Sequence, residues 1–179
     1  MVHTSLKEYP EAKKDLDEAE KFDPKVDWIY LARAQLLMAE KSDVKKAEEQ
    51  LDKAVALNPK RSITYIYRVM GKATDERWKE AVEDTNKAIE VDPKNADAFT
   101  LRGVLRALGL NELKEGAADL DKALELNPEH SQAKNNRAQL RNLGYNGPSR
   151  HTSPTRKRGM TVHPRLRVGL VWLWLRSGQ

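Results

Sequence analysis

The chain has 179 residues, of which 33% are charged, 39% are hydrophobic and none is cysteine, and its formal net charge is +5. The lack of cysteine excludes a disulfide framework and thiolate chemistry, and no run of about 18 apolar residues could span a bilayer. The first residues contain no apolar stretch behind a basic start, so no signal peptide is predicted and a cytoplasmic location is expected.

One sequence pattern recurs four times and dominates the chain. Its copies end at Pro24, Pro59, Pro93 and Pro128, which are 35, 34 and 35 residues apart. Self-similarity at this period is typical of solenoids, which stack one supersecondary unit on the next. The sequence therefore predicts a stacked repeat architecture for most of its length.

Each of these prolines closes a stretch with one face of small and apolar side chains. The positions twelve and five residues before the proline are Ala or Gly, and the position eight before it is Leu or Thr, so all three fall on one side of a helix. This stripe comprises Ala12, Leu16, Ala19, Ala47, Leu51, Ala54, Ala81, Thr85, Ala88, Gly116, Leu120 and Ala123. Such small residues predict close approach of a neighbouring helix, and the Asp-Pro or Asn-Pro that follows predicts a helix stop.

A second pattern follows each proline and predicts another helix. An aromatic residue (or Lys134) stands six positions after the proline, with an arginine three positions further on. We expect helices at about 27–40, 62–73, 95–108 and 131–143, each with an N-cap. The predicted N-caps are Asp27, Ser62, Asn95 and Ser131.

The arginines of this second pattern form a column at one position of each unit. Its members are Arg33, Arg68, Arg102 and Arg137. Their regular repetition favours a structural role, such as pairing with acidic residues of the next helix. A ladder that binds anionic ligands is the alternative interpretation.

The order of aromatic, small residue, Ala, Leu, Ala and Pro over about 34 residues resembles the tetratricopeptide repeat family, over residues 6–143. The resemblance implies an all-α, right-handed α-solenoid of antiparallel helix pairs. Within residues 1–145 it implies a partial repeat at 6–24, repeats at 25–59, 60–93 and 94–128, and a capping helix at 129–143. Two units carry an extra residue, which we expect in the turns near Ser42 and Asn111.

The composition changes after residue 145. Residues 146–179 contain seven of the 32 Lys and Arg residues and no Asp or Glu, so the positive charge belongs to this segment. Its Gly, Pro, Ser and Arg content predicts a disordered or poorly ordered basic tail. The arginines and tryptophans of this tail suggest an alternative function, attachment to nucleic acid or to an anionic membrane surface.

No enzymatic constellation is visible in the sequence. The four histidines are isolated, no pair has the helical spacing of metal ligands, and no phosphate-binding glycine loop occurs. Carboxylates alternate with lysines at helical spacing, which indicates solvated helix faces with weak ion pairs. We therefore expect no catalysis, no cofactor, no metal and no small-molecule substrate. Because the first unit starts with its second helix, the chain also fits a segment of a larger enzyme or signalling protein.

The resemblance implies that the first helix of each repeat lines a concave groove for a partner. The groove positions are Trp28, Leu31, Gln35, Ile63, Ile66, Tyr67, Met70, Thr100, Leu101, Val104, Asn135 and Asn136. Some family members hold a peptide carboxylate with Lys and Asn where this chain has Leu31, Ile66 and Thr100. We therefore expect a scaffold that binds an apolar peptide or a partner helix, with packing between helices as the competing interpretation for each residue.

Overall fold

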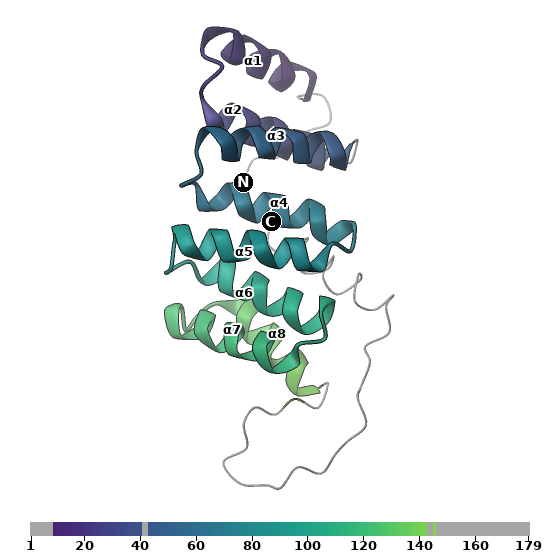
Figure 1. The fold of residues 1–179 in the computed structure, drawn as a ribbon, viewed down its shortest axis with the longest axis vertical. Coiled ribbons are helices and arrows are strands. Elements are labelled where there is room, and N and C mark those ends of the chain that lie inside the picture. Colours follow the sequence, from purple (N-terminus) through teal and green to yellow (C-terminus); the bar gives the residue numbers. More distant parts are fainter. Residues whose placement is uncertain (1–8, 41–42, 143–144, 146–179) are drawn as a thin grey trace, which may run out of the picture.

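The computed structural model describes residues 9–40, 43–142 and 145, and no strand occurs among them (Figure 1). The basic tail at 146–179, residues 6–8 of the partial repeat and the turn at Ser42 lie outside these residues. The helices are α1 (Tyr9–Phe22), α2 (Asp27–Ala39), α3 (Val44–Leu57), α4 (Ser62–Thr74), α5 (Trp78–Val91), α6 (Ala96–Val104), the π-helical turn η1 (Leu105–Gly109), α7 (Leu113–Leu126) and α8 (Ser131–Asn142).

Successive helices pair into hairpins that stack along one axis. Helices α2 and α3, α4 and α5, and α6 and α7 pack against each other most extensively, and each hairpin also contacts the next. Figure 1 shows the array running from α1 at one end to α7 and α8 at the other. The predicted all-α solenoid is therefore confirmed over the described residues.

The same turn ends α1, α3, α5 and α7. The backbone N–H of the Asp or Asn before each proline donates to the carbonyl oxygen of the alanine four residues earlier. The side chain of that Asp or Asn accepts from the backbone N–H two residues later, at 2.9–3.2 Å. Because proline disfavours helical backbone in the residue before it, and the side chain closes the turn, the predicted stops are found at each site.

The stripe of small and apolar residues forms the seam of each hairpin. Its members in α3, α5 and α7 are all buried, and between α6 and α7 two glycines face each other across the seam. A Cβ atom added to Gly116 would lie 2.5 Å from the carbonyl oxygen of Gly103, and one added to Gly103 would lie 2.8 Å from that of Gly116. Glycine at this crossing therefore lets two backbones meet directly.

Three of the four predicted N-caps do not cap their helices. Asn95 does cap α6, because its side chain accepts from a backbone N–H three residues later at 3.0 Å. Asp27 and Ser62 are instead the first residues of their helices, and neither helix has a side-chain cap. The Ser62 hydroxyl donates to a backbone carbonyl of α5, and Asp27 binds an arginine of the next repeat. At α8 the capping acceptor is His130 Nδ1, not the predicted Ser131.

The extra residue of the third full repeat lies inside a helix. Residues Leu105–Gly109 continue α6 as a π-helical turn, with the Leu110 N–H donating to the Leu105 carbonyl at 3.1 Å. The prediction of an insertion in the turn near Asn111 is therefore wrong. A π turn takes up an additional residue while the helix continues, and here it brings Gly109 against the Trp78 ring of α5.

Candidate partner-binding face

Four of the predicted groove residues are buried in the array. Leu31 is 8% exposed, Val104 3%, and Thr100 and Leu101 0%. The Thr100 hydroxyl donates to the Ala96 carbonyl at 2.8 Å, within its own helix. These four side chains hold helices together and offer little surface to a partner in this structure.

Other predicted positions remain open to solvent. Trp28 is 52% exposed and Ile63 is 42% exposed, and they occupy equivalent positions at the starts of α2 and α4. On α4, Ile63 is followed at helical spacing by three partly exposed side chains. We call this set the first-helix stripe: Trp28, Ile63, Ile66, Tyr67 and Met70.

The first-helix stripe lies where neighbouring repeats meet. Tyr67 packs against the apolar cluster of the α2–α3 hairpin, and Ile66 packs against the clusters of the following hairpins. The Tyr67 hydroxyl makes no hydrogen bond within the described part of the chain. At the position of Trp28 and Ile63, α6 carries Asp97 and α8 carries Gln132. The apolar character at this position is therefore confined to the first two full repeats.

The polar end of the predicted groove is on α8. Asn135 is exposed and Asn136 is partly buried, while Gln35 on α2 is also partly buried. The amide nitrogen of Asn136 is buried without a hydrogen-bond partner among the described residues. The gradient from apolar to polar positions along the array is thus present at the surface as well as in the sequence.

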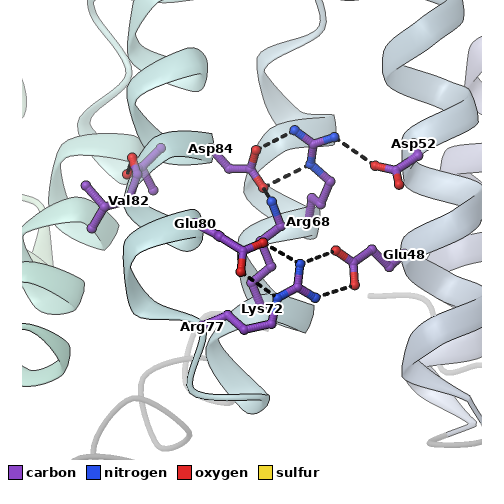
Figure 2. A network of polar contacts seen from close by, with 9 residues as sticks. Glu48, Asp52, Arg68, Lys72, Arg77, Glu80, Val82 and Asp84 are labelled. Atoms are coloured by element: carbon purple, nitrogen blue, oxygen red, sulfur yellow. Dashed lines mark hydrogen bonds and ion pairs between the residues drawn. The ribbon is translucent and has the colours of Figure 1, made fainter.

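Arg68 of the arginine column forms ion pairs with the helices on both sides of α4 (Figure 2). Arg68 of α4 donates through Nη1 to Asp52 of α3 at 2.8 Å and through Nε to Asp84 of α5 at 2.9 Å. Lys72 Nζ lies 2.8 Å from Oδ2 of Asp84, the oxygen that also accepts from Arg68 Nε, and the Arg68 guanidinium lies 5.5 Å from the centre of the Tyr65 ring. One arginine therefore joins the second helix of the preceding repeat to the second helix of its own.

This arrangement repeats along the array. Each column arginine reaches a side chain sixteen positions earlier, at 2.6–2.8 Å, and Arg102 with Arg106 binds Asp119 as Arg68 with Lys72 binds Asp84. The pairs at sixteen positions are Arg33 with Asp17, Arg68 with Asp52, Arg102 with Asn86, and Arg137 with Asp121. The predicted structural role of the column is confirmed, and Arg68 and Arg102 bind side chains on both neighbouring helices.

Sequence reasoning identified the arginines but not the full network. Asp84 and Asp119 are 3% and 5% exposed, and each lies nine residues before a closing proline. The second cation, Lys72 or Arg106, follows the arginine by one helical turn, which is the signal that could have revealed it. In α3 the equivalent position is Gln50, whose side-chain oxygen is buried without a partner among the described residues.

Further ion pairs connect successive repeats. Arg77 binds Glu48 of α3 through both terminal nitrogens at 2.8 and 2.9 Å and also binds Glu80 of α5, as Figure 2 shows. The hydrogen bond from Arg77 lowers the pKa of Glu80. Arg61 pairs with Asp27 of the preceding repeat, and this hydrogen bond lowers the pKa of Asp27. The charged side chains thus fix the stacking of repeats.

The described residues contain no group of three or more His, Cys, Asp or Glu side chains that could hold a metal ion. None of the helices in this part of the chain has the length and apolar character needed to cross a membrane.

No family model and no curated protein matches this sequence. Solved structures do match it: the TPR domain of Arabidopsis OM64 is 28% identical, with a TM-score of 0.62 over 66% of this chain and 96% of that domain. The second TPR domain of human RPAP3, solved with the HSP70 peptide SGPTIEEVD, is 24% identical, with a TM-score of 0.58 over 63% and 92%. MamA is 17% identical, with a TM-score of 0.64 over 80% and 86%. The described helices therefore have the tetratricopeptide-repeat fold, as the sequence resemblance implied.

Proposed function

We propose that this tetratricopeptide-repeat array is a non-catalytic interaction module that binds an apolar peptide or a partner helix on the first-helix stripe. The observation that carries the proposal is the exposure of Trp28 and Ile63, at 52% and 42%, at equivalent positions of adjacent repeats. Aromatic and aliphatic side chains that stay half open are typical anchors of protein interfaces, because a partner removes their apolar surface from water. Two such anchors at one repeat spacing suit an extended or helical ligand.

The ion-pair network supports this function by keeping the stripe in place. Trp28 directly follows Asp27 at the start of α2, and Asp27 is bound to Arg61 of the next repeat, which directly precedes α4 and lies two residues before Ile63. The two anchors are therefore carried by helix ends that are tied to each other. A surface that is already ordered loses less conformational entropy when a ligand binds.

The structural neighbours support a peptide as the kind of ligand. The human RPAP3 domain with this fold was solved with an HSP70 peptide that ends in EEVD. In this chain, Leu31, Ile66 and Thr100 stand where family members that grip an acidic terminus carry Lys and Asn, and two of the three are buried. We therefore propose an apolar segment, not an acidic carboxyl terminus, as the ligand.

The experiment is a selection of displayed random peptides against the full chain, followed by affinity measurement by fluorescence anisotropy. The selected peptides should carry apolar side chains at i and i+3 or i+4. Replacing both anchors, Trp28→Ala with Ile63→Ala, should weaken their binding by at least about tenfold, since each anchor side chain at an interface centre commonly contributes above about 1 kcal/mol.

The matched control uses the same helix position in the later repeats. Asp97→Asn with Gln132→Ala should leave peptide affinity within about twofold of the parent, because neither side chain supplies apolar contact and asparagine can still hydrogen-bond His130. Circular dichroism would verify that both double variants keep their helix content. Selected peptides with acidic termini, or equal affinity for the parent and the anchor variant, would contradict the proposal.

A further inference from the structure

The first described helix carries the seam pattern of a second helix, yet no described helix covers it. In α3, α5 and α7 every member of the small and apolar stripe is buried, whereas no residue of α1 is buried. Ala12, Leu16 and Ala19 are partly exposed, and Phe22 at the end of the helix is 94% exposed. Helix α1 therefore presents a seam of the kind that first helices cover elsewhere in the array.

The last described helix carries the complementary pattern. Ala138 of α8 is exposed, whereas the residues at its position in α2, α4 and α6 are buried against the second helix of their own hairpin. Arg141, one turn further on, is also exposed. Nη1 of Arg137 is buried without a hydrogen-bond partner in the described part of the chain. Helix α8 is thus a first helix without a second helix on its seam among the described residues.

The charges on these two helices are complementary in a specific way. Asp15 on α1 lies nine residues before its closing proline, the position of the buried aspartates of α5 and α7. Each of those aspartates binds a column arginine and a second cation four residues after it on the preceding helix. Asp15 is exposed and forms no ion pair with a described residue, while α8 offers Arg137 and, four residues later, Arg141.

We propose that copies of this chain associate head to tail, with α1 of one copy packed on α8 of the next as the missing second helix of a hairpin. In this arrangement Asp15 binds Arg137 and Arg141, as the aspartates of α5 and α7 bind their two cations. Ala12 and Ala138 meet in the seam, as Gly116 and Gly103 do between α7 and α6. The proposal uses neither Trp28 nor Ile63 and stands apart from the proposed peptide site.

The partner of α1 is a second copy because the two helices lie at opposite ends of the array (Figure 1). The α1 seam and the α8 seam are different surfaces, so any row of copies has a free α1 seam at one end and a free α8 seam at the other. The assembly is therefore an open chain of copies. Tyr145 is the described residue that lies on this part of α8, with its ring 5.7 Å from the Arg137 guanidinium. One ring covers less of a helix than a second helix does, which leaves Ala138 and Arg141 accessible.

The test is sedimentation velocity of the full chain at concentrations from about 5 µM to about 0.5 mM. An interface of one helix pair is small by the standards of stable complexes, so its dissociation constant should lie within this range. The weight-average mass should rise above the 20.4 kDa of one chain as concentration increases, and it should fall when added salt screens the ion pairs. A mass of one chain at every concentration would overturn the proposal, as would occur if other residues of the same chain cover either end.

Two blocking variants separate head-to-tail association from other modes. Ala12→Glu blocks the α1 seam and Ala138→Glu blocks the α8 seam, so each variant alone should be monomeric. Mixed in equal amounts they should form a dimer and nothing larger, because one variant keeps an intact α8 seam and the other an intact α1 seam. This dimer also shows that both variants are folded.

A control variant places the same charge elsewhere. Ala118→Glu, at an exposed position of α7, should self-associate like the parent chain. If either blocking variant alone associates as the parent does, or if their mixture stays monomeric, head-to-tail packing of α1 on α8 is excluded.

Discussion

Asp84 illustrates how single residues hold this array together. Its carboxylate is 3% exposed and is bound by both Arg68 and Lys72 of the preceding helix. A buried charge loses its hydration, and only close, hydrogen-bonded partners offset that cost. Loss of Asp84, Arg68 or Lys72 should therefore destabilise the array much more than loss of one partner from an ion pair on an open surface.

At the residue scale we predict that Asp84→Ala lowers the free energy of unfolding by about 3–5 kcal/mol, because two cations stay buried without their shared partner. The matched control is Asp52→Ala, which removes the other partner of Arg68, a carboxylate whose side chain is 58% exposed. That change should cost at most about 1 kcal/mol. Urea unfolding followed by circular dichroism measures both, and equal losses would contradict the prediction.

At the scale of elements, the turns inside two hairpins contain a residue with left-handed backbone. Glu76 follows α4 with a φ of 57°, and Asn111 precedes α7 with a φ of 61°. Left-handed backbone brings the Cβ atom close to the carbonyl oxygen, which is unfavourable for glutamate but better tolerated by asparagine. The Glu76 turn therefore carries strain that the Asn111 turn largely avoids.

We predict that Glu76→Gly raises the free energy of unfolding by up to about 1 kcal/mol, because the relief of left-handed strain exceeds the entropy that glycine gains in the unfolded chain. Asn111→Gly, the matched change in the other turn, should have a smaller effect. Thermal unfolding of the two variants beside the parent measures the difference. A destabilised Glu76→Gly variant would show that this glutamate side chain contributes more than its backbone costs.

At the scale of the whole array, stacking depends on polar contacts that cross from one repeat to the next. Arg61 binds Asp27 of the preceding repeat, and His130 Nε2 lies 2.8 Å from the Asp97 carboxylate of the repeat before it. In a solenoid each repeat contacts only its neighbours, so stability is close to a sum of repeat and interface contributions. Conditions that weaken these pairs should therefore separate repeats before they melt individual helices.

The pH dependence of stability follows from the Asp27–Arg61 pair. The hydrogen bond from Arg61 holds the pKa of Asp27 below its ordinary value of 3.8. Because the folded state has the lower pKa, the pair stabilises the array at neutral pH, and its contribution is lost as the pH falls from about 4 through the folded pKa. Asp27→Asn should lower stability at neutral pH and flatten this acid loss. Urea unfolding at several pH values between about 2 and 7 gives the free energy of unfolding of the parent and of the variant as a function of pH. If both proteins lose stability equally as the pH falls, Asp27 is not the group responsible.

The sequence by itself determined the repeat, the helix order and the turns that end α1, α3, α5 and α7. These are local properties: Ala47, Leu51 and Ala54 share a face because of helical periodicity, and Asn58-Pro59 ends that helix through backbone geometry. The tetratricopeptide resemblance followed from the same local pattern written four times. The arginine column was also visible, since its spacing is a property of the chain alone.

Only the tertiary structure decided which of these side chains are buried and what they bind. Leu31 and Trp28 are both apolar groove positions, yet one is 8% and the other 52% exposed, because exposure depends on how closely the neighbouring hairpin approaches. The pairing of Lys72 with Asp84 and the π turn at Leu105–Gly109 likewise depend on contacts between residues that are distant in sequence. Periodicity places a side chain on a helix face, but the packing of adjacent repeats sets what that face meets.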